Sequence, residues 1–145
     1  MAEAPPPPPP PGPQIEVTSV DLNPAEECAF EDGLGLAIGF SSDSDLQGFR
    51  WCVNYVVDTA KRRYIVQVGA TQPEDYVQGH NAMTFLAEGL SIEEVPKALW
   101  QQTNGLLVAT LTGPTGEEAM AVNMVVQIRV DESGELRRYI FNPME

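Results

Sequence analysis

The stretch from Phe49 to Asp58 constrains the fold of this chain more than any other. Large apolar or aromatic side chains occupy every second position: Phe49, Trp51, Val53, Tyr55 and Val57. Successive side chains of a β-strand point to opposite faces, so this period of two predicts a strand. Its large face is expected to lie in a core, because aromatic side chains gain most from burial.

Similar runs occur along most of the chain. Leu34, Leu36, Ile38 and Phe40 alternate with the small residues Gly35, Ala37 and Gly39. Further runs are Ile15–Leu22, Tyr64–Val68, Ala82–Ala87, Gly105–Thr112, Glu118–Val130 and Leu136–Phe141. In the first of them, one face is expected to hold Ile15, Val17, Ser19 and Asp21, and the other Glu16, Thr18, Val20 and Leu22. About eight short strands separated by turns are typical of an all-β, antiparallel β-sandwich.

Two segments depart from this pattern. Residues 1–14 form a tail with proline at every position from Pro5 to Pro11, which predicts a disordered polyproline arm outside a domain at 15–145. The arm is interpreted as a spacer; the alternative is a ligand for groove-type domains such as SH3, WW or profilin. Ser91–Glu94 reads as a capping box, but Pro96 limits it to a short helical turn near residues 91–100.

The chain is strongly acidic. Its 145 residues include 8 Lys and Arg but 21 Asp and Glu, which gives a net charge of -13. Such a balance disfavours direct nucleic-acid binding and anionic membrane surfaces, and favours basic partners. The simpler interpretation is that the acidity only maintains solubility. Two cysteines, no leader-like segment and no long apolar run predict an intracellular protein with reduced thiols, in the cytoplasm, cilium or nucleus.

The sequence offers little catalytic chemistry. His80 is the single histidine, and no cysteine stands near it at metal-ligand spacing. No phosphate-binding loop, nucleophile elbow, zinc-protease or EF-hand pattern is present. We therefore expect no enzyme, with no catalytic residue, metal or cofactor. Lys61–Arg63 is the single basic run; it can dock an acidic partner, although three charges at a hairpin tip are more often a polar turn.

Short motifs along the chain follow a familiar order. They are Asp21-Leu-Asn-Pro24, Trp51-Cys-Val-Asn-Tyr55-Val56, Met83-Thr-Phe85, Gly116-Glu-Glu118 and Arg138-Tyr-Ile-Phe-Asn-Pro143. From Ile15 onwards this order resembles the immunoglobulin-like domain of the anti-silencing histone H3–H4 chaperone family. The resemblance implies an immunoglobulin-like antiparallel β-sandwich that acts by binding other proteins.

The resemblance also implies a place for the partner. That family grips the histone H3 helix with an apolar strand, which corresponds here to Leu106–Thr110 with Val108 at its centre. With two further candidates on the following strand, the expected partner-binding residues are Leu106, Val108, Thr110, Met120 and Val122. For Val122 the simpler interpretation is burial in the core.

Several positions depart from the family pattern. An arginine of its histone-binding surface falls at Ala121 and an acid near Gln102. The paired acids that it uses to bind other chaperones fall at Gln47 and Gly48. The resemblance therefore implies a diverged relative that kept the scaffold and changed its partner.

Three functions follow as hypotheses. The first is a non-enzymatic scaffold or adaptor subunit of a larger assembly such as a ciliary axoneme, binding a helix or a basic segment of a protein partner. The second is retained histone H3–H4 chaperoning. The third is a lipid-anchor carrier of the prenyl-binding type, in which Gly35, Ala37 and Gly39, with Met83 and Met124, leave a cavity between the sheets.

Overall fold

The computed structural model describes residues 13–59, 61–90 and 104–144, and within these ranges every regular element is a β-strand. The strands are β1 (Ile15–Asn23), β2 (Cys28–Ala29), β3 (Leu34–Ser42), β4 (Leu46–Asp58), β5 (Arg63–Ala70), β6 (Glu74–Tyr76), β7 (Gly79–Ala87), β8 (Gly105–Thr112), β9 (Glu118–Val130) and β10 (Leu136–Ile140). The all-β, antiparallel prediction is confirmed. Most of the polyproline arm, and the helical turn expected near residues 91–100, lie outside the described residues.

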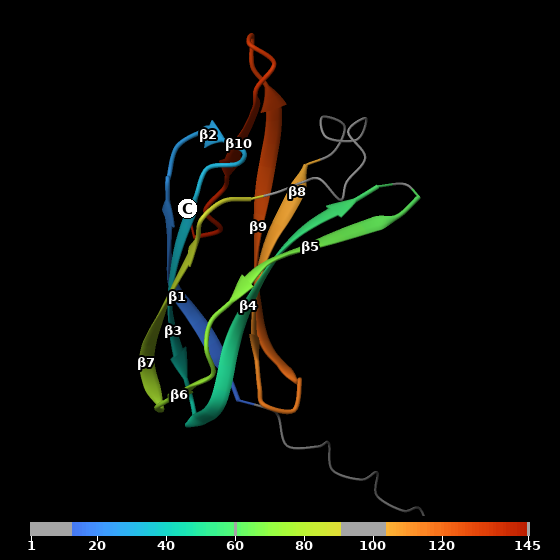
Figure 1. The fold of residues 1–145 in the computed structure, drawn as a ribbon. Helices are drawn as coiled ribbons and strands as arrows, with labels where there is room; N and C mark the ends of the chain where they lie inside the picture. Colours follow the sequence, from blue (N-terminus) through green and yellow to red (C-terminus); the bar gives the residue numbers. More distant parts are fainter. Residues whose placement is uncertain (1–12, 60, 91–103, 145) are drawn as a thin grey trace, which may run out of the picture.

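The strands form two antiparallel sheets that lie one over the other (Figure 1). The smaller sheet has the order β1-β3-β7. The larger has the order β2-β10-β9-β8-β4-β5, with β6 paired to the first part of β4. In Figure 1 the β4–β5 hairpin extends sideways from the body of the molecule. None of the described segments forms an apolar helix of membrane-spanning length.

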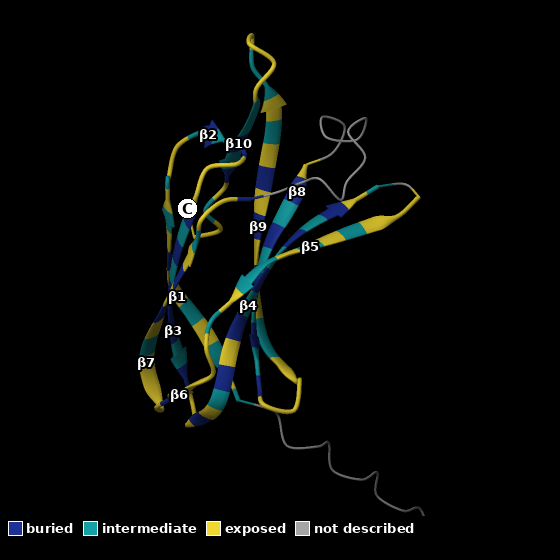
Figure 2. Ribbon diagram, viewed as in Figure 1, coloured by how far each residue is buried: buried dark blue, intermediate teal, exposed yellow. Residues whose placement is uncertain are grey.

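The large side chains of β4 are buried in the core, as the alternation in the sequence predicts. Phe49, Trp51, Val53, Tyr55 and Val57 are all buried, while the residues between them are exposed or half-buried (Figure 2). The predicted bounds of β8 and β9 are also those of the structure. Alternation is thus sufficient to place β8 and β9 and the buried face of β4.

The expected faces of β1 are wrong in its second half. The pairing of β1 with β3 shifts register between Val17 and Ser19, which marks a β-bulge. An extra residue at a bulge reverses the alternation beyond it. Ile15 and Val17 are half-buried before the shift, but Val20 and Leu22 pack on the core after it, rather than Ser19 and Asp21.

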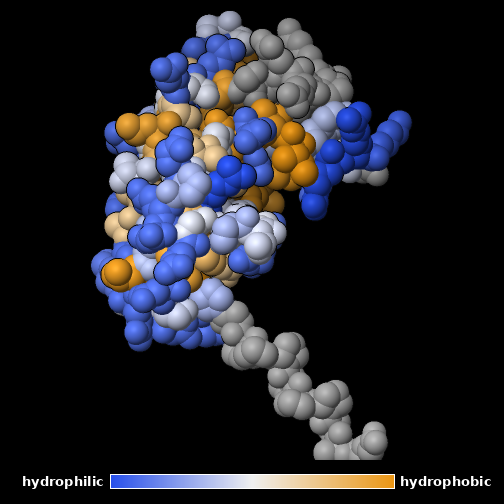
Figure 3. Space-filling view, turned by 60° about the horizontal axis from the view of Figure 1, so that its bottom comes forward, coloured by the Kyte–Doolittle hydropathy of each residue, from blue (hydrophilic) through white to orange (hydrophobic). Residues whose placement is uncertain are grey.

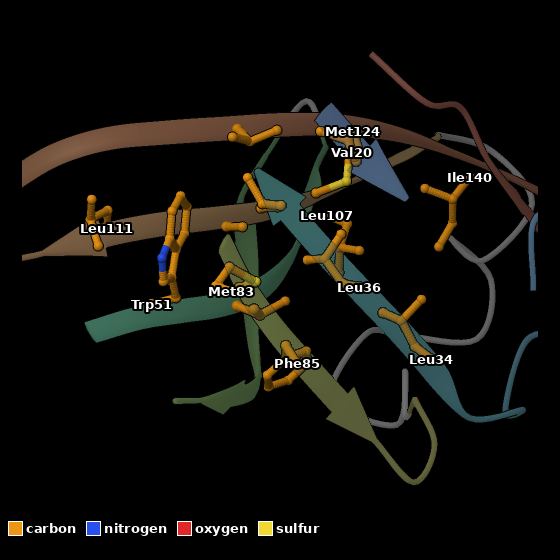
Figure 4. Packing of buried hydrophobic residues seen from close by; sticks show 14 of the residues in the cluster. Val20, Leu34, Leu36, Trp51, Met83, Phe85, Leu107, Leu111, Met124 and Ile140 are labelled. Atoms are coloured by element: carbon orange, nitrogen blue, oxygen red, sulfur yellow. The ribbon is translucent and has the colours of Figure 1, made fainter. Parts of the chain in front are cut away.

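The space between the sheets is filled by side chains from both (Figure 4). Phe40 of the smaller sheet meets the Trp51 and Tyr76 rings edge-on, with ring centroids 5.5 and 5.1 Å apart. Met83 and Met124 are buried in the same cluster. Edge-to-face aromatic contacts of this kind add to the stability that burial alone provides.

The small residues of β3 lie on the other side from the core. Leu34, Leu36 and Ile38 point inward, so the alternate residues face outward. A β-carbon on Gly39 would approach the hydroxyls of Ser19 and Thr18 on the neighbouring strand rather than the interior. The premise of the lipid-carrier hypothesis, that these residues leave a cavity between the sheets, is therefore wrong.

Arg138 is a charged residue inside this fold, with only 1% of its surface exposed. Its guanidinium donates hydrogen bonds to the carbonyl oxygens of Phe30 (2.5 Å), Asp32 (2.7 Å) and Gly33 (2.9 Å). No described acid forms an ion pair with it, and burial lowers the pKa of the guanidinium. Three carbonyl dipoles thus replace the water that Arg138 loses, and in return Arg138 holds the 30–33 loop against β10.

Alkaline pH is expected to destabilise the fold through buried tyrosines. Burial raises the pKa of Tyr76 from 10.0 to about 12. Below pH 10 the phenol is protonated in both the folded and unfolded states, so its full contribution to the free energy of unfolding is present. That contribution declines as pH rises from 10 towards 12, because the unfolded state then loses the proton first. Urea unfolding should therefore show a loss of about 1.4 kcal/mol per pH unit above pH 10 from this group. The Tyr76→Phe variant should lose stability less steeply; equal slopes would contradict the assignment.

A candidate protein-binding face

Three rows of side chains cross four neighbouring strands on the outward side of the larger sheet. The paired residues of the rows, in the order β5, β4, β8, β9, are Ile65, Val56, Leu106 and Val125; then Gln67, Asn54, Val108 and Asn123; then Ala70, Cys52, Thr110 and Ala121. We call these residues the uncharged face. The positions between them on β4, β8 and β9 are buried in the core, so these side chains point away from it.

No member of the uncharged face carries a charge, although one residue in five of the whole chain is charged. A surface patch of twelve residues with that composition would hold two or more charged side chains, and solvent-exposed patches usually hold more. Depletion of charge at the centre of a patch is a compositional mark of protein–protein interfaces.

The first row is apolar throughout and continues beyond β9. Ile65 and Val125 at its two sides are 56% and 43% exposed, while Val56 and Leu106 between them are half-buried. The Phe141 amide donates a hydrogen bond to the Val125 carbonyl (2.9 Å), and the Phe141 side chain is 46% exposed. We call these five residues the apolar row. Isolated exposed apolar side chains are ordinary, but a continuous line across four strands and the residue after β10 is a feature of binding surfaces.

Charged residues begin one row beyond Ile65 and Val56. Arg63 and Asp58 pair across β4 and β5, with two hydrogen bonds of 2.7 and 3.1 Å between guanidinium and carboxylate. These bonds hold the pKa of Asp58 below its usual value and raise that of Arg63. Arg62, at the hairpin tip, lies over the Tyr64 ring at 4.9 Å. Figure 3 shows hydrophobic surface gathered beside the root of this hairpin and a hydrophilic tip.

The structure separates the five residues expected to bind a partner. Leu106, Val108 and Thr110 lie in the middle of the uncharged face, half-buried among the neighbouring strands. Met120 pairs with the buried Leu111 and packs against the core. Val122 is only 7% exposed, because its position in the β8–β9 ladder points it into the core. A partner on the outward side therefore meets the first three residues and not the last two.

Four members of the apolar row were not among the expected residues: Val56, Ile65, Val125 and Phe141. The sequence does contain a signal for the face. Between Arg50 and Asp58 the outward positions of β4 are all uncharged, which is unusual for the solvent side of a strand in so acidic a chain. Ala121, where the resembled family has an arginine, is itself an exposed member of the uncharged face. Gln102 lies outside the described residues.

Two further surface features of the described residues are a small groove and an exposed histidine. A groove of about 220 Å³ on the outward side of the smaller sheet has Gly35 and Ala37 on its floor and the 78% exposed Leu86 at its edge. His80 is exposed on β7. No three metal-ligating side chains gather anywhere in the described ranges.

Comparison with protein-family models gives no match, and comparison with curated proteins gives none either. The geometry of the uncharged face is therefore the main guide to function.

Proposed function

We propose that this protein is a non-enzymatic protein-binding module, a scaffold or adaptor subunit, and that its partner binds on the uncharged face. The observation that carries the proposal is the apolar row, which crosses four strands within a patch free of charge and continues to Phe141. Burying such a patch is favourable because apolar area leaves water without the cost of desolvating a charge.

The dimensions of the face fit one secondary-structure element of a partner. Neighbouring strands lie about 4.8 Å apart, so the apolar row from β5 to Phe141 is about 19 Å long. An α-helix rises about 1.5 Å per residue, so about 13 residues, between three and four turns, cover that length. A stable dimer of whole domains buries about 800 Å² on each partner, a larger surface than a single helix needs. A helix with one apolar stripe is the favoured occupant.

The proposal includes the fold relationship. We take the two sheets to be an immunoglobulin-like sandwich and the chain to be a diverged relative of the anti-silencing chaperones, with Leu106, Val108 and Thr110 on the binding strand. Histone H3–H4 chaperoning remains the second candidate function, because those three side chains do face outward together. Ala121, Gln47 and Gly48 favour a different partner over histones.

The test is a single charge placed in the apolar row. Val125→Asp should abolish partner binding, by about 100-fold or more in affinity, since an unpaired carboxylate would be buried at the interface. Val125 is exposed in the free protein, so the free energy of unfolding should fall by no more than about 1 kcal/mol. Val77→Asp is the matched control, because Val77 is also exposed, at 65%, and lies outside the uncharged face.

The measurement is affinity capture from extracts of the native cells, followed by mass spectrometry. A protein retained by the wild type and by Val77→Asp, but lost from Val125→Asp, is a partner of this face. Loss of histones H3 and H4 from Val125→Asp would favour the chaperone function. Equal capture by all three proteins would contradict the proposed site.

A further inference from the structure

The exposed cations of the described residues are gathered on one layer of the molecule. The outward positions of β4 and β5, with the turn between them, carry the four cations Arg50, Lys61, Arg62 and Arg63 against one acid, Asp58, a local balance of +3. The three strands of the smaller sheet carry Glu16 and Asp21 and no Lys or Arg. A chain of net charge -13 therefore presents a positively charged hairpin at one side of its uncharged face.

Three of these four cations have no partner of opposite charge among the residues described. Asp58 pairs with Arg63, and Glu27 pairs with Arg129 through hydrogen bonds of 2.5 and 2.6 Å. Arg50, Lys61 and Arg62 form no such ion pair with any described acid. Two of these three cations lie at the tip of the β4–β5 hairpin, directly beyond the Ile65 end of the apolar row.

Hydrogen bonds join the two strands next to the hairpin tip. The Thr59 amide and hydroxyl both donate to the Arg62 carbonyl, at 2.9 and 2.8 Å. The Arg62 guanidinium lies on the Tyr64 ring. Figure 1 shows the hairpin extending beyond the body, and Figure 3 shows that its end is hydrophilic. A partner element along the apolar row would therefore end beside positive charges.

We propose that the segment bound by the uncharged face is acidic, and that its acidic residues lie over the β4–β5 hairpin. This inference rests on the proposed function and names the chemistry of its partner. It reverses the expectation of a basic partner that the net charge alone gives. Exposed charges interact over about 8 Å at physiological ionic strength, so the charges nearest to a bound segment affect it most. At the Ile65 end of the apolar row these are the cations of the β4–β5 hairpin.

The experiment is a selection of random 14-residue peptides displayed on phage against the full chain. Peptides that also bind Val125→Asp are removed, so that only ligands of the uncharged face remain. The enriched peptides should combine an apolar repeat with a net negative charge. Their affinity should fall with added salt, as expected for charge pairs at an interface rim.

Two matched variants locate the contact. The first is the double variant Lys61→Ser/Arg62→Ser, which removes two positive charges at the hairpin. The second is Thr18→Glu/Thr84→Glu, which adds two negative charges at exposed positions of the smaller sheet, so both variants change the net charge by -2. The hairpin variant should weaken the selected peptides by about tenfold. The other should change their affinity by less than about twofold, because its new charges lie on the far layer.

The outcomes separate this inference from the proposed function. Enrichment of basic or uncharged peptides that depend on Val125 would overturn the acidic partner and leave the binding face standing. Equal weakening by the two variants would also overturn it, since net charge and not the hairpin would then be responsible. If no enriched peptide depends on Val125, both proposals are contradicted.

Discussion

Replacing Arg138 by methionine should lower the free energy of unfolding by about 3 to 5 kcal/mol, among the largest effects of any single substitution in this chain. The methionine fills a similar volume but donates no hydrogen bond. The carbonyl oxygens of Phe30, Asp32 and Gly33 would then lose their donor at a place that water reaches poorly. The midpoint of urea unfolding, followed by circular dichroism, measures the change.

Arg137→Met is the control for this substitution. Arg137 is the preceding residue on the same strand, but its side chain is 27% exposed and its contacts to Glu27 and Glu135 are 3.8 and 3.5 Å long. Exposed pairs of this kind contribute about 1 kcal/mol or less. Equal destabilisation by both substitutions would show that the three carbonyl bonds do not stabilise the fold in the way described.

Gly105→Ala should be the second strongly destabilising change, by about 2 to 4 kcal/mol. Gly105 is the first residue of β8, and a β-carbon there would overlap the hydroxyl and ring of Tyr55. Tyr55 is 1% exposed and sits in the core, so it cannot move aside without disturbing Phe30, whose ring it meets edge-on at 5.6 Å. Thermal or urea unfolding measures the effect.

Gly35→Ala provides the comparison on the other sheet. Its β-carbon would meet Asn23 and Leu86 at 3.4 Å, an ordinary contact distance, on an outward face. Alanine in a strand also loses less conformational entropy than glycine on folding. The substitution should therefore change stability by less than about 1 kcal/mol. If Gly35→Ala destabilised the fold as much as Gly105→Ala, the overlap with Tyr55 would not be the cause.

Alternation of side chains was enough to predict most of the fold. It gave β8 and β9 their bounds and β4 its buried face, because each is long enough to show several periods. The two shortest strands, β2 and β6, have two and three residues and show no period at all. The bulge near Thr18 also has no local signature, since it depends on how β1 pairs with β3.

The candidate site could be predicted only in part, for a related reason. The strand Leu106–Thr110 was expected to meet a partner, and its outward residues do lie on the uncharged face. The sequence does not show how β8 aligns with β9, however, and this alignment turns Val122 inward and Val125 outward. The apolar row joins single residues from four separate strands with Phe141, which follows β10, so it exists only once the sheet has formed. The net charge likewise gives no sign of the positively charged β4–β5 hairpin.

The hydrogen bonds of Arg138 join residues that are 105 to 108 positions apart in the chain. The Asn142 amide similarly donates to the Val20 carbonyl, across 122 positions. During synthesis on the ribosome, these hydrogen bonds of the 30–33 loop and of β1 can therefore form only after Arg138 and Asn142 have emerged. Until then the edge of the larger sheet beside β9 lies open, and contacts so distant in sequence form slowly. The nascent chain is consequently most vulnerable to aggregation just before its last strand is made, which is when a chaperone would be needed.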